Sequence, residues 1–169
     1  MGSWDNVGGV DLFFNSKSAR KKMEAMGIAK DDWLTTADHE FAHADWEGVT
    51  QTAGKGQQFN AVNAARESFI ADVNDIYKNP DFHLQAYTDT YRNNERNNIL
   101  ANEAHSKIRE FEIDGSLPKR MNTARAAIAA ASEFGEPTST LGKEQLASAR
   151  GLVIMVGSYE DFRGELNKL

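Results

Sequence analysis

The sequence predicts a mainly α-helical protein: a compact single domain over residues 1–169, built from several helices, with at most a short strand or hairpin at its N-terminus. The length of 169 residues suits one hydrophobic core. Hydrophobic residues make up 40% and charged residues 26%, which is the balance of a globular chain. From residue 59 onward, apolar residues recur at three- and four-residue spacing, which is the periodicity of helices with one buried face.

Residues 1–14 contain the one good candidate for a strand. Gly8 and Gly9 precede a short run of β-prone residues, which predicts either a strand or an ordered arm. A polar residue after this run can cap a first helix, which Gly27 would end. The N-terminal part is therefore expected to pass from extended chain into helix.

A helix is predicted over residues 31–52, with Asp31 as its N-cap. Successive helical residues are rotated by about 100°, which places His39 and His43 on one face. The main apolar residues fall on the opposite face and are Leu34, Ala37, Phe41 and Ala44. We therefore expect this stripe to pack against the core and the two histidines to face away from it.

Further amphipathic helices follow. The first covers residues 59–76 and should end before Asn79 and Pro80, where an N-cap followed by proline opens the next helix. Another helix is expected over residues 95–114. Its core stripe consists of Leu100, Ala104, Ile108 and Phe111.

Toward the C-terminus, Pro118 and Gly135 mark the start and the end of one more helix. Residues 136–142 are expected to form a loop. Residues 146–156 fit either a helix or a strand, because a short apolar run rich in β-prone residues has no decisive periodicity. Gly157 is expected to separate this segment from a short terminal helix.

The composition excludes some classes of partner and ligand. The formal net charge is −6, whereas nucleic acids and anionic membranes both require a basic face, so neither is expected as a partner. The chain has no cysteine, so a metal site would have to use histidine and carboxylate ligands. The sequence does not specify the oligomeric state.

The sequence also bears on localisation. No apolar run approaches the roughly 18–20 residues that span a bilayer. The N-terminus lacks the basic and then apolar pattern of a secretory signal. We therefore expect a cytoplasmic protein or one delivered by a dedicated secretion route.

The clearest functional pattern is His39-Glu40-Phe41-Ala42-His43. Two histidines four residues apart on a helix can bind one metal ion. A glutamate directly after the first histidine can reach a metal-bound water and act as a general base. The alternative is that His39 and His43 are solvated helix residues that bind no metal.

This HExxH pattern resembles the metal-binding helix of the zincin metallopeptidases. The resemblance covers these five residues and a third ligand farther along the chain. It implies a zinc cofactor held by His39 and His43, Glu40 as the catalytic base, and a protein or peptide substrate. A mostly helical chain departs from the zincin pattern, because most zincins place a twisted sheet over the metal helix.

A catalytic zinc ion needs a third protein ligand. Glu47 is excluded, because eight residues of helix place it about 12 Å along the axis from His39. In zincins of the glutamate type the third ligand is a glutamate on a second helix, which implies Glu103, beside the apolar stripe of its helix. The alternative for Glu103 is a solvent-exposed ion pair with Lys107.

Other residues are weaker candidates for the site. His105 is the second choice as a metal ligand and could instead donate a hydrogen bond to an oxyanion. Tyr91 or Tyr87 could stabilise an oxyanion in the same way. Glu110 and Glu112 are further carboxylates on the same helix as Glu103.

Two functions from different classes follow from these patterns. The first is a zinc-dependent peptidase. A peptidase in so small a chain suggests an effector or toxin-type domain. The second is a non-catalytic helical interaction protein or phage-type structural protein with an incidental HExxH. A helical glycosidase using Glu40 or Glu47 also stays open, because carboxylate pairs leave no clear sequence signature. A di-iron bundle does not fit, because no second Glu-x-x-His accompanies Glu40 and His43.

Overall fold

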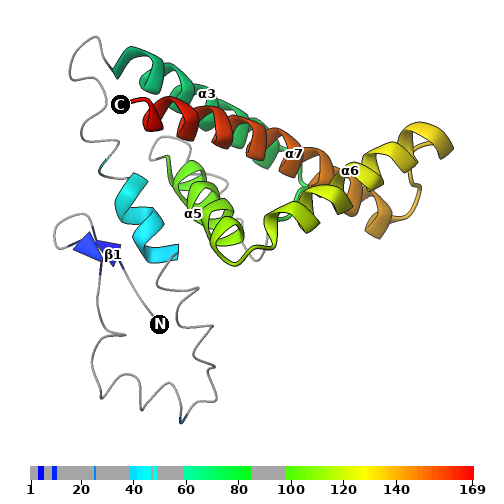
Figure 1. Ribbon diagram of the computed structural model, residues 1–169. Coiled ribbons are helices and arrows are strands. Elements are labelled where there is room, and N and C mark those ends of the chain that lie inside the picture. Colours follow the sequence, from blue (N-terminus) through cyan, green and yellow to red (C-terminus); the bar gives the residue numbers. More distant parts are fainter. Residues whose placement is uncertain are drawn as a thin grey trace.

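In the part of the chain that the structure describes, the fold rests on four long helices and the short helix that carries the HExxH residues (Figure 1). The structure is a computed structural model. It describes residues 4–5, 9–10, 25, 39–46, 48, 59–84 and 98–169. We call residues 39–46, drawn in cyan, the motif helix.

Helix α3 (Asn60–Lys78) confirms the first predicted amphipathic helix. Val62, Phe69 and Val73 are buried along one face at the predicted spacing. Arg66 interrupts this apolar stripe and is also buried, with its guanidinium carbon 5.4 Å from the ring centre of Trp46. The favourable contact between a cation and an aromatic face explains how an arginine is accommodated there.

The segment after α3 differs from the prediction. Asn79 accepts a hydrogen bond from the backbone N–H of Asp81 through its side chain, and residues 79–84 form a turn and an irregular segment. The prediction that Asn79 and Pro80 open a helix is therefore wrong for the described residues. The same Asn-Pro pattern serves a tight turn, because an asparagine side chain can mimic a backbone turn.

Helix α5 (Ile99–Ile113) lies within the predicted range 95–114. The expected stripe is buried and consists of Leu100, Ala104, Ile108 and Phe111. Asn98 precedes the helix with a positive φ of 52°, and Gly115 follows it with φ of +77°. Glycine adopts this left-handed conformation at little cost, so Gly115 ends the helix as a glycine past a helix C-terminus commonly does.

Helices α6 (Leu117–Phe134) and α7 (Thr140–Asn167) form a hairpin. Gly135, with φ of +94°, ends α6 as predicted. The ambiguous run 146–156 is helical. The first three residues of α7 lie inside the range expected to be a loop, and α7 continues through Gly157, so the prediction that Gly157 separates two elements is wrong. Ser139 caps α7 by accepting a hydrogen bond from the Gly142 N–H at 3.0 Å.

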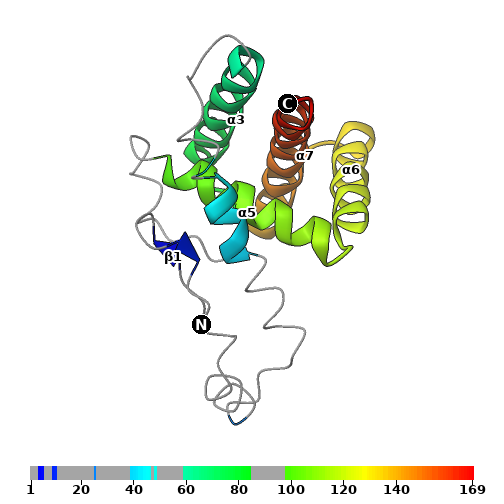
Figure 2. The ribbon, with the colours of Figure 1, turned by 60° about the vertical axis from the view of Figure 1, so that its left-hand side comes forward.

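The helices share one core. In Figure 2, α3, α7 and α6 stand side by side in that order and α5 crosses beneath them, with the motif helix next to α5. Large aromatic side chains fill the centre, among them Trp46, Phe69, Tyr159 and Phe162. The motif helix is therefore anchored to the bundle by its own tryptophan.

The N-terminal prediction holds where the structure describes it. β1 (Trp4–Asp5) and β2 (Gly9–Val10) pair antiparallel, with Trp4 opposite Val10 and Asp5 opposite Gly9. The rest of residues 1–14 lies outside the described residues. The fold is thus mainly α with a short N-terminal hairpin. In the described ranges, no helix has the length and apolar character needed to cross a membrane.

Candidate metal centre

The motif helix turns its histidines toward the bundle, which contradicts the predicted orientation. Phe41 is 50% exposed, whereas Ala42, His43 and Trp46 are buried. Trp46 lies one turn beyond His43 and packs between Phe69 and Phe162. Its burial removes more apolar surface than burial of Phe41 would, which orients the helix. Leu34 and Ala37, the other end of the expected stripe, lie outside the described residues.

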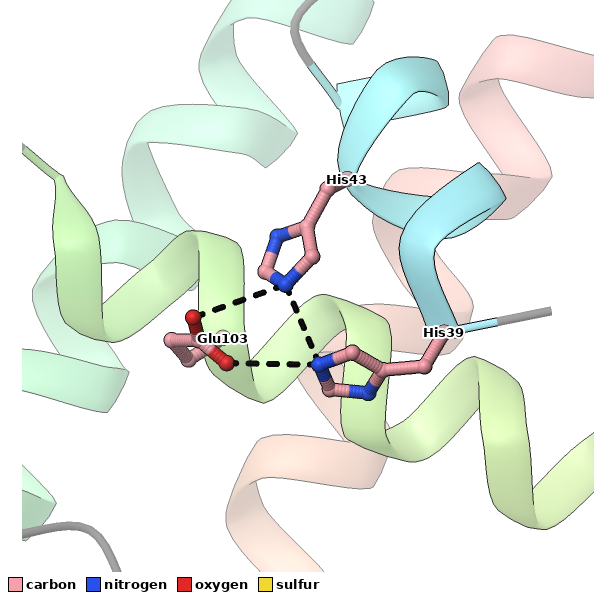
Figure 3. Close-up of side chains that lie close together, drawn as sticks. All are labelled: His39, His43 and Glu103. Carbon is pink, nitrogen blue, oxygen red and sulfur yellow. Dashed lines mark hydrogen bonds and ion pairs between the residues drawn. The ribbon is translucent and has the colours of Figure 1, made fainter. Parts of the chain in front are cut away.

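The two histidines meet Glu103 of α5 at this interface (Figure 3). The Nε2 atoms of His39 and His43 are 3.1 Å apart. One oxygen of Glu103 lies 3.5 Å from His39 Nε2, and the other lies 3.4 Å from His43 Nε2. The approach of Glu103 to both imidazoles, expected from the sequence, is present.

Each imidazole is held from behind by a second residue of α5. His39 Nδ1 donates to Glu110 Oε2 at 3.1 Å, and His43 Nδ1 donates to the side-chain oxygen of Asn102 at 2.8 Å. A carboxylate and an amide oxygen can only accept, so the proton of each ring resides on Nδ1. The Nε2 lone pairs of both rings are therefore directed at Glu103 and at each other.

The two Nε2 atoms and both oxygens of Glu103 converge in this arrangement, and such a group of acceptors favours a cation between them. In the metal-free state, a proton bound to His39 provides this positive charge. Burial by itself would lower the pKa of His39, but the hydrogen bonds and negative charges of Glu103 and Glu110 outweigh burial and raise that pKa to about 9. Burial opposes ionisation of Glu103 too, but the histidines hold its pKa far below the usual range.

The three side chains are also close enough to share one ion, because one ligand atom from each lies within 4.8 Å of the other two. Zinc bonds of about 2.0–2.1 Å in a tetrahedron imply ligand atoms roughly 3.3 Å apart. The two Nε2 atoms are 3.1 Å apart, and each lies 3.4–3.5 Å from a different oxygen of Glu103, so the carboxylate faces both nitrogens near that spacing. Two imidazoles and a carboxylate are a ligand set that zinc accepts, and the donor set and the geometry therefore fit the ion.

Glu40 lies on the motif helix beside His39 and is partly buried. Its carboxylate is not one of the three groups that converge among the described residues. The role of Glu40 as a general base therefore stays a prediction.

His105 does not reach the cluster. It lies two residues after Glu103, which rotates it by about 200° to the opposite side of α5. There it is fully buried against Trp46, Tyr159 and Phe162, and neither ring nitrogen has a hydrogen-bond partner in the described part of the chain. The prediction of His105 as an alternative ligand is therefore wrong. Tyr87 and Tyr91 lie outside the described residues.

The remaining carboxylates have other partners. Lys107 binds Glu110, with its ammonium nitrogen 3.0 and 2.9 Å from the two oxygens, so the alternative pairing of Lys107 with Glu103 is wrong. Glu112 pairs with Arg109 at the surface of α5. Glu110 contacts the outer nitrogen of His39 instead of entering the group of three.

Sequence reasoning missed Asn102 and the role of Lys107. A usable pattern existed, because Glu103, Lys107 and Glu110 are spaced by four and three residues and so share one face of α5 with neighbouring Asn102. This pattern assigns Asn102 and Lys107 to the site only once it is known that the motif helix crosses this face of α5.

A groove lined by other described residues lies away from this cluster. It has a volume of about 860 Å³, runs between α6 and α7, and includes no residue of the three-residue cluster. Its lining is mostly apolar, with charged side chains such as Lys119 and Glu144 at its edges.

Comparison with protein-family models, curated proteins and solved structures gave no match for this chain.

Proposed function

We propose that this protein is a zinc-dependent hydrolase that acts on peptide bonds of a protein or peptide substrate. One zinc ion would be held by His39, His43 and Glu103. The effector-type role and the delivery route suggested by the size of the chain stay predictions.

The observation that supports the proposal is the convergence of His39, His43 and Glu103, whose ligand atoms lie within 4.8 Å of one another, with each imidazole already oriented by a hydrogen bond on its other nitrogen. Such outer partners orient the ring and raise its basicity as a ligand. Three protein ligands also leave a fourth position open, which distinguishes a catalytic zinc from a structural one.

The chemistry of the site divides between the ion and the protein. When bound, zinc would acidify a water molecule and polarise the scissile carbonyl. Glu40 is the residue placed next to the first ligand, where it can accept the proton of that water and later deliver it to the leaving amine. Asn102 and Glu110 keep the two imidazoles in the tautomer that ligation needs.

Metal analysis of the whole chain tests the first part of the proposal. Protein stripped with a chelator and reloaded should bind about one zinc per chain, and His43→Ala should abolish tight binding. His83→Ala is a matched control, since His83 is half exposed and pairs with Glu144 away from the cluster. An absence of uptake by the wild type would leave a non-catalytic helical module as the better interpretation.

Peptide hydrolysis tests the second part. The zinc-loaded protein should cleave members of a quenched fluorescent peptide library, and Glu40→Gln should retain zinc but lose cleavage, because an amide cannot accept the water's proton. Glu133→Gln, an exposed change on α6, should leave cleavage unaltered. Full activity of Glu40→Gln would show that Glu40 is not the base.

A further inference from the structure

Lys107 lies on the face of α5 that meets the motif helix, and its side chain is only 12% exposed. Its ammonium group contacts both oxygens of Glu110, at 3.0 and 2.9 Å. Glu110 Oε2 in turn accepts the Nδ1 proton of His39 at 3.1 Å. One chain of contacts therefore runs from Lys107 through Glu110 to a proposed metal ligand.

A second ion pair on α5 shows that the low exposure of the Lys107–Glu110 pair is unusual. Arg109 and Glu112 have the same order and the same three-residue spacing, but their side chains are 39% and 33% exposed. Exposed pairs of this kind contribute little to stability, and buried ones often contribute nothing net because both charges lose water. Stability alone therefore does not explain why Lys107 and Glu110 are buried together beside His39.

We propose that Lys107 is a positioning residue of the metal centre. It holds the Glu110 carboxylate against the outer nitrogen of His39 and balances its charge, so that Glu103 supplies the one carboxylate that ligates the ion. This inference rests on the proposed metal site.

Two physical effects follow from the contacts. The grip on both Glu110 oxygens fixes the carboxylate, which fixes the plane of the His39 ring and the direction of its Nε2 lone pair. The positive charge of Lys107 also offsets the negative charge of Glu110. The His39 imidazole is therefore not flanked by two uncompensated carboxylates, those of Glu103 and Glu110. Lys107 also lies 5.7 Å from the ring centre of Phe111, but its contact toward the metal centre is Glu110, so its effect on zinc binding should vanish when Glu110 loses its charge.

A double-mutant cycle on the full chain tests this coupling. Zinc affinity is measured by competition with a chromophoric chelator for Lys107→Met, Glu110→Gln and the double variant. Each single change should weaken zinc binding by about 10-fold or more, the usual effect of losing an outer partner. The double variant should bind zinc about as Glu110→Gln does. Arg109→Met, the matched control, should bind zinc like the wild type.

A second readout reports the ring itself. In histidine ¹H–¹⁵N spectra of the zinc-loaded protein, the His39 Nδ1–H resonance should shift in Lys107→Met and in Glu110→Gln, while that of His43 stays in place. Lys107→Arg, which keeps a cation against Glu110, should restore both the affinity and the resonance. If Lys107→Met does not fold, Lys107→Gln takes its place in the cycle.

The outcomes separate this inference from the proposed function. Additive losses in the cycle, or unchanged zinc affinity in Lys107→Met, would overturn the positioning role and leave the metal site standing. A wild-type protein that binds no zinc would overturn the metal site and this inference with it.

Discussion

His105→Phe should stabilise the protein without affecting zinc binding. The His105 ring is fully buried, with ring centres of Trp46, Tyr159 and Phe162 at 5.3, 5.5 and 6.1 Å. Neither nitrogen makes a hydrogen bond of good geometry among the described residues, and the nearby backbone carbonyl of Ala42 only favours a proton on the ring. A phenyl ring has nearly the same shape and removes the two unpaired polar atoms.

The magnitude follows from two opposing contributions. A buried polar group without a partner costs about 1–3 kcal/mol. The slightly larger phenyl ring costs up to about 1 kcal/mol through tighter packing. A net gain of about 1–2 kcal/mol is expected, which raises Tm by roughly 2–8 °C in a chain of this size.

Acidification should enlarge the difference between His105→Phe and the wild type. Burial first, and then the charges of Arg163, His43 and Arg109, lower the pKa of His105 from 6.5 to about 3, while the carbonyl of Ala42 opposes the shift. The unfolded chain therefore takes up a proton at His105 below about pH 6.5, and the folded chain takes it up only near pH 3. This contribution to wild-type stability is complete above pH 6.5 and is lost as the pH falls toward 3.

Urea unfolding of metal-free protein at pH 7.5 and at pH 5 measures both effects. His83→Phe serves as the control, because His83 is exposed and its replacement should change stability little at either pH. A loss of stability in His105→Phe, or a loss of zinc binding, would refute the reasoning, because either result means that the ring nitrogens have a partner or a ligand.

Three further predictions concern packing and the metal. Gly151→Ala should destabilise the protein by about 1–3 kcal/mol in urea unfolding, because an added Cβ would lie 2.5 Å from the Phe82 ring. Gly157→Ala in the same helix has open space around the added Cβ and should stabilise the protein by up to about 1 kcal/mol in the same assay. Zinc at about 100 times its Kd should stabilise the wild type by roughly 2.7 kcal/mol in thermal unfolding, and His43→Ala should show no such gain. Zinc binding near pH 7 should release about one proton from His39, because the pKa of His39 is about 9 in the metal-free state. Calorimetry in buffers of different ionisation enthalpy should detect this proton. A binding enthalpy that does not depend on the buffer would contradict the assigned protonation of His39.

Helix positions were predictable where the apolar period and the end signals agreed. α5 and α6 end at glycines with positive φ, and the sequence marks both ends. The apolar run within 146–156 was not assignable, because its β-prone residues fit both a helix and a strand. Packing of α7 against α3 and α6 decides it, and such contacts between distant segments leave no trace in local periodicity.

The orientation of the motif helix failed for a related reason. A helical wheel groups residues by angle and does not weigh how much surface each one buries. Phe41 belongs to the apolar stripe by angle, yet Trp46 finds a pocket among Phe69 and Phe162 and buries more area. Rotation to bury Trp46 brings His43 and His39 inward with it.

The crossing of the two helices also explains why the sequence could predict Glu103 as a ligand but could not predict the roles of Asn102 and Glu110. Glu103 flanks the stripe of α5, so any helix crossing α5 on that side would meet it. Asn102 and Glu110 become partners of His43 and His39 only at the observed crossing, which places each one behind a different ring. Their roles depend on a relative placement of two helices that neither segment encodes alone.

The interface between the motif helix and α5 is stabilised in two different ways along its length. At Trp46 it is an apolar contact, which needs no cofactor. At His39, His43 and Glu103 it brings the acceptor atoms of three side chains together, so this end gains from a cation. Zinc would therefore add a bond between two helices that are far apart in the sequence, which couples the docking of the motif helix to occupancy of the site.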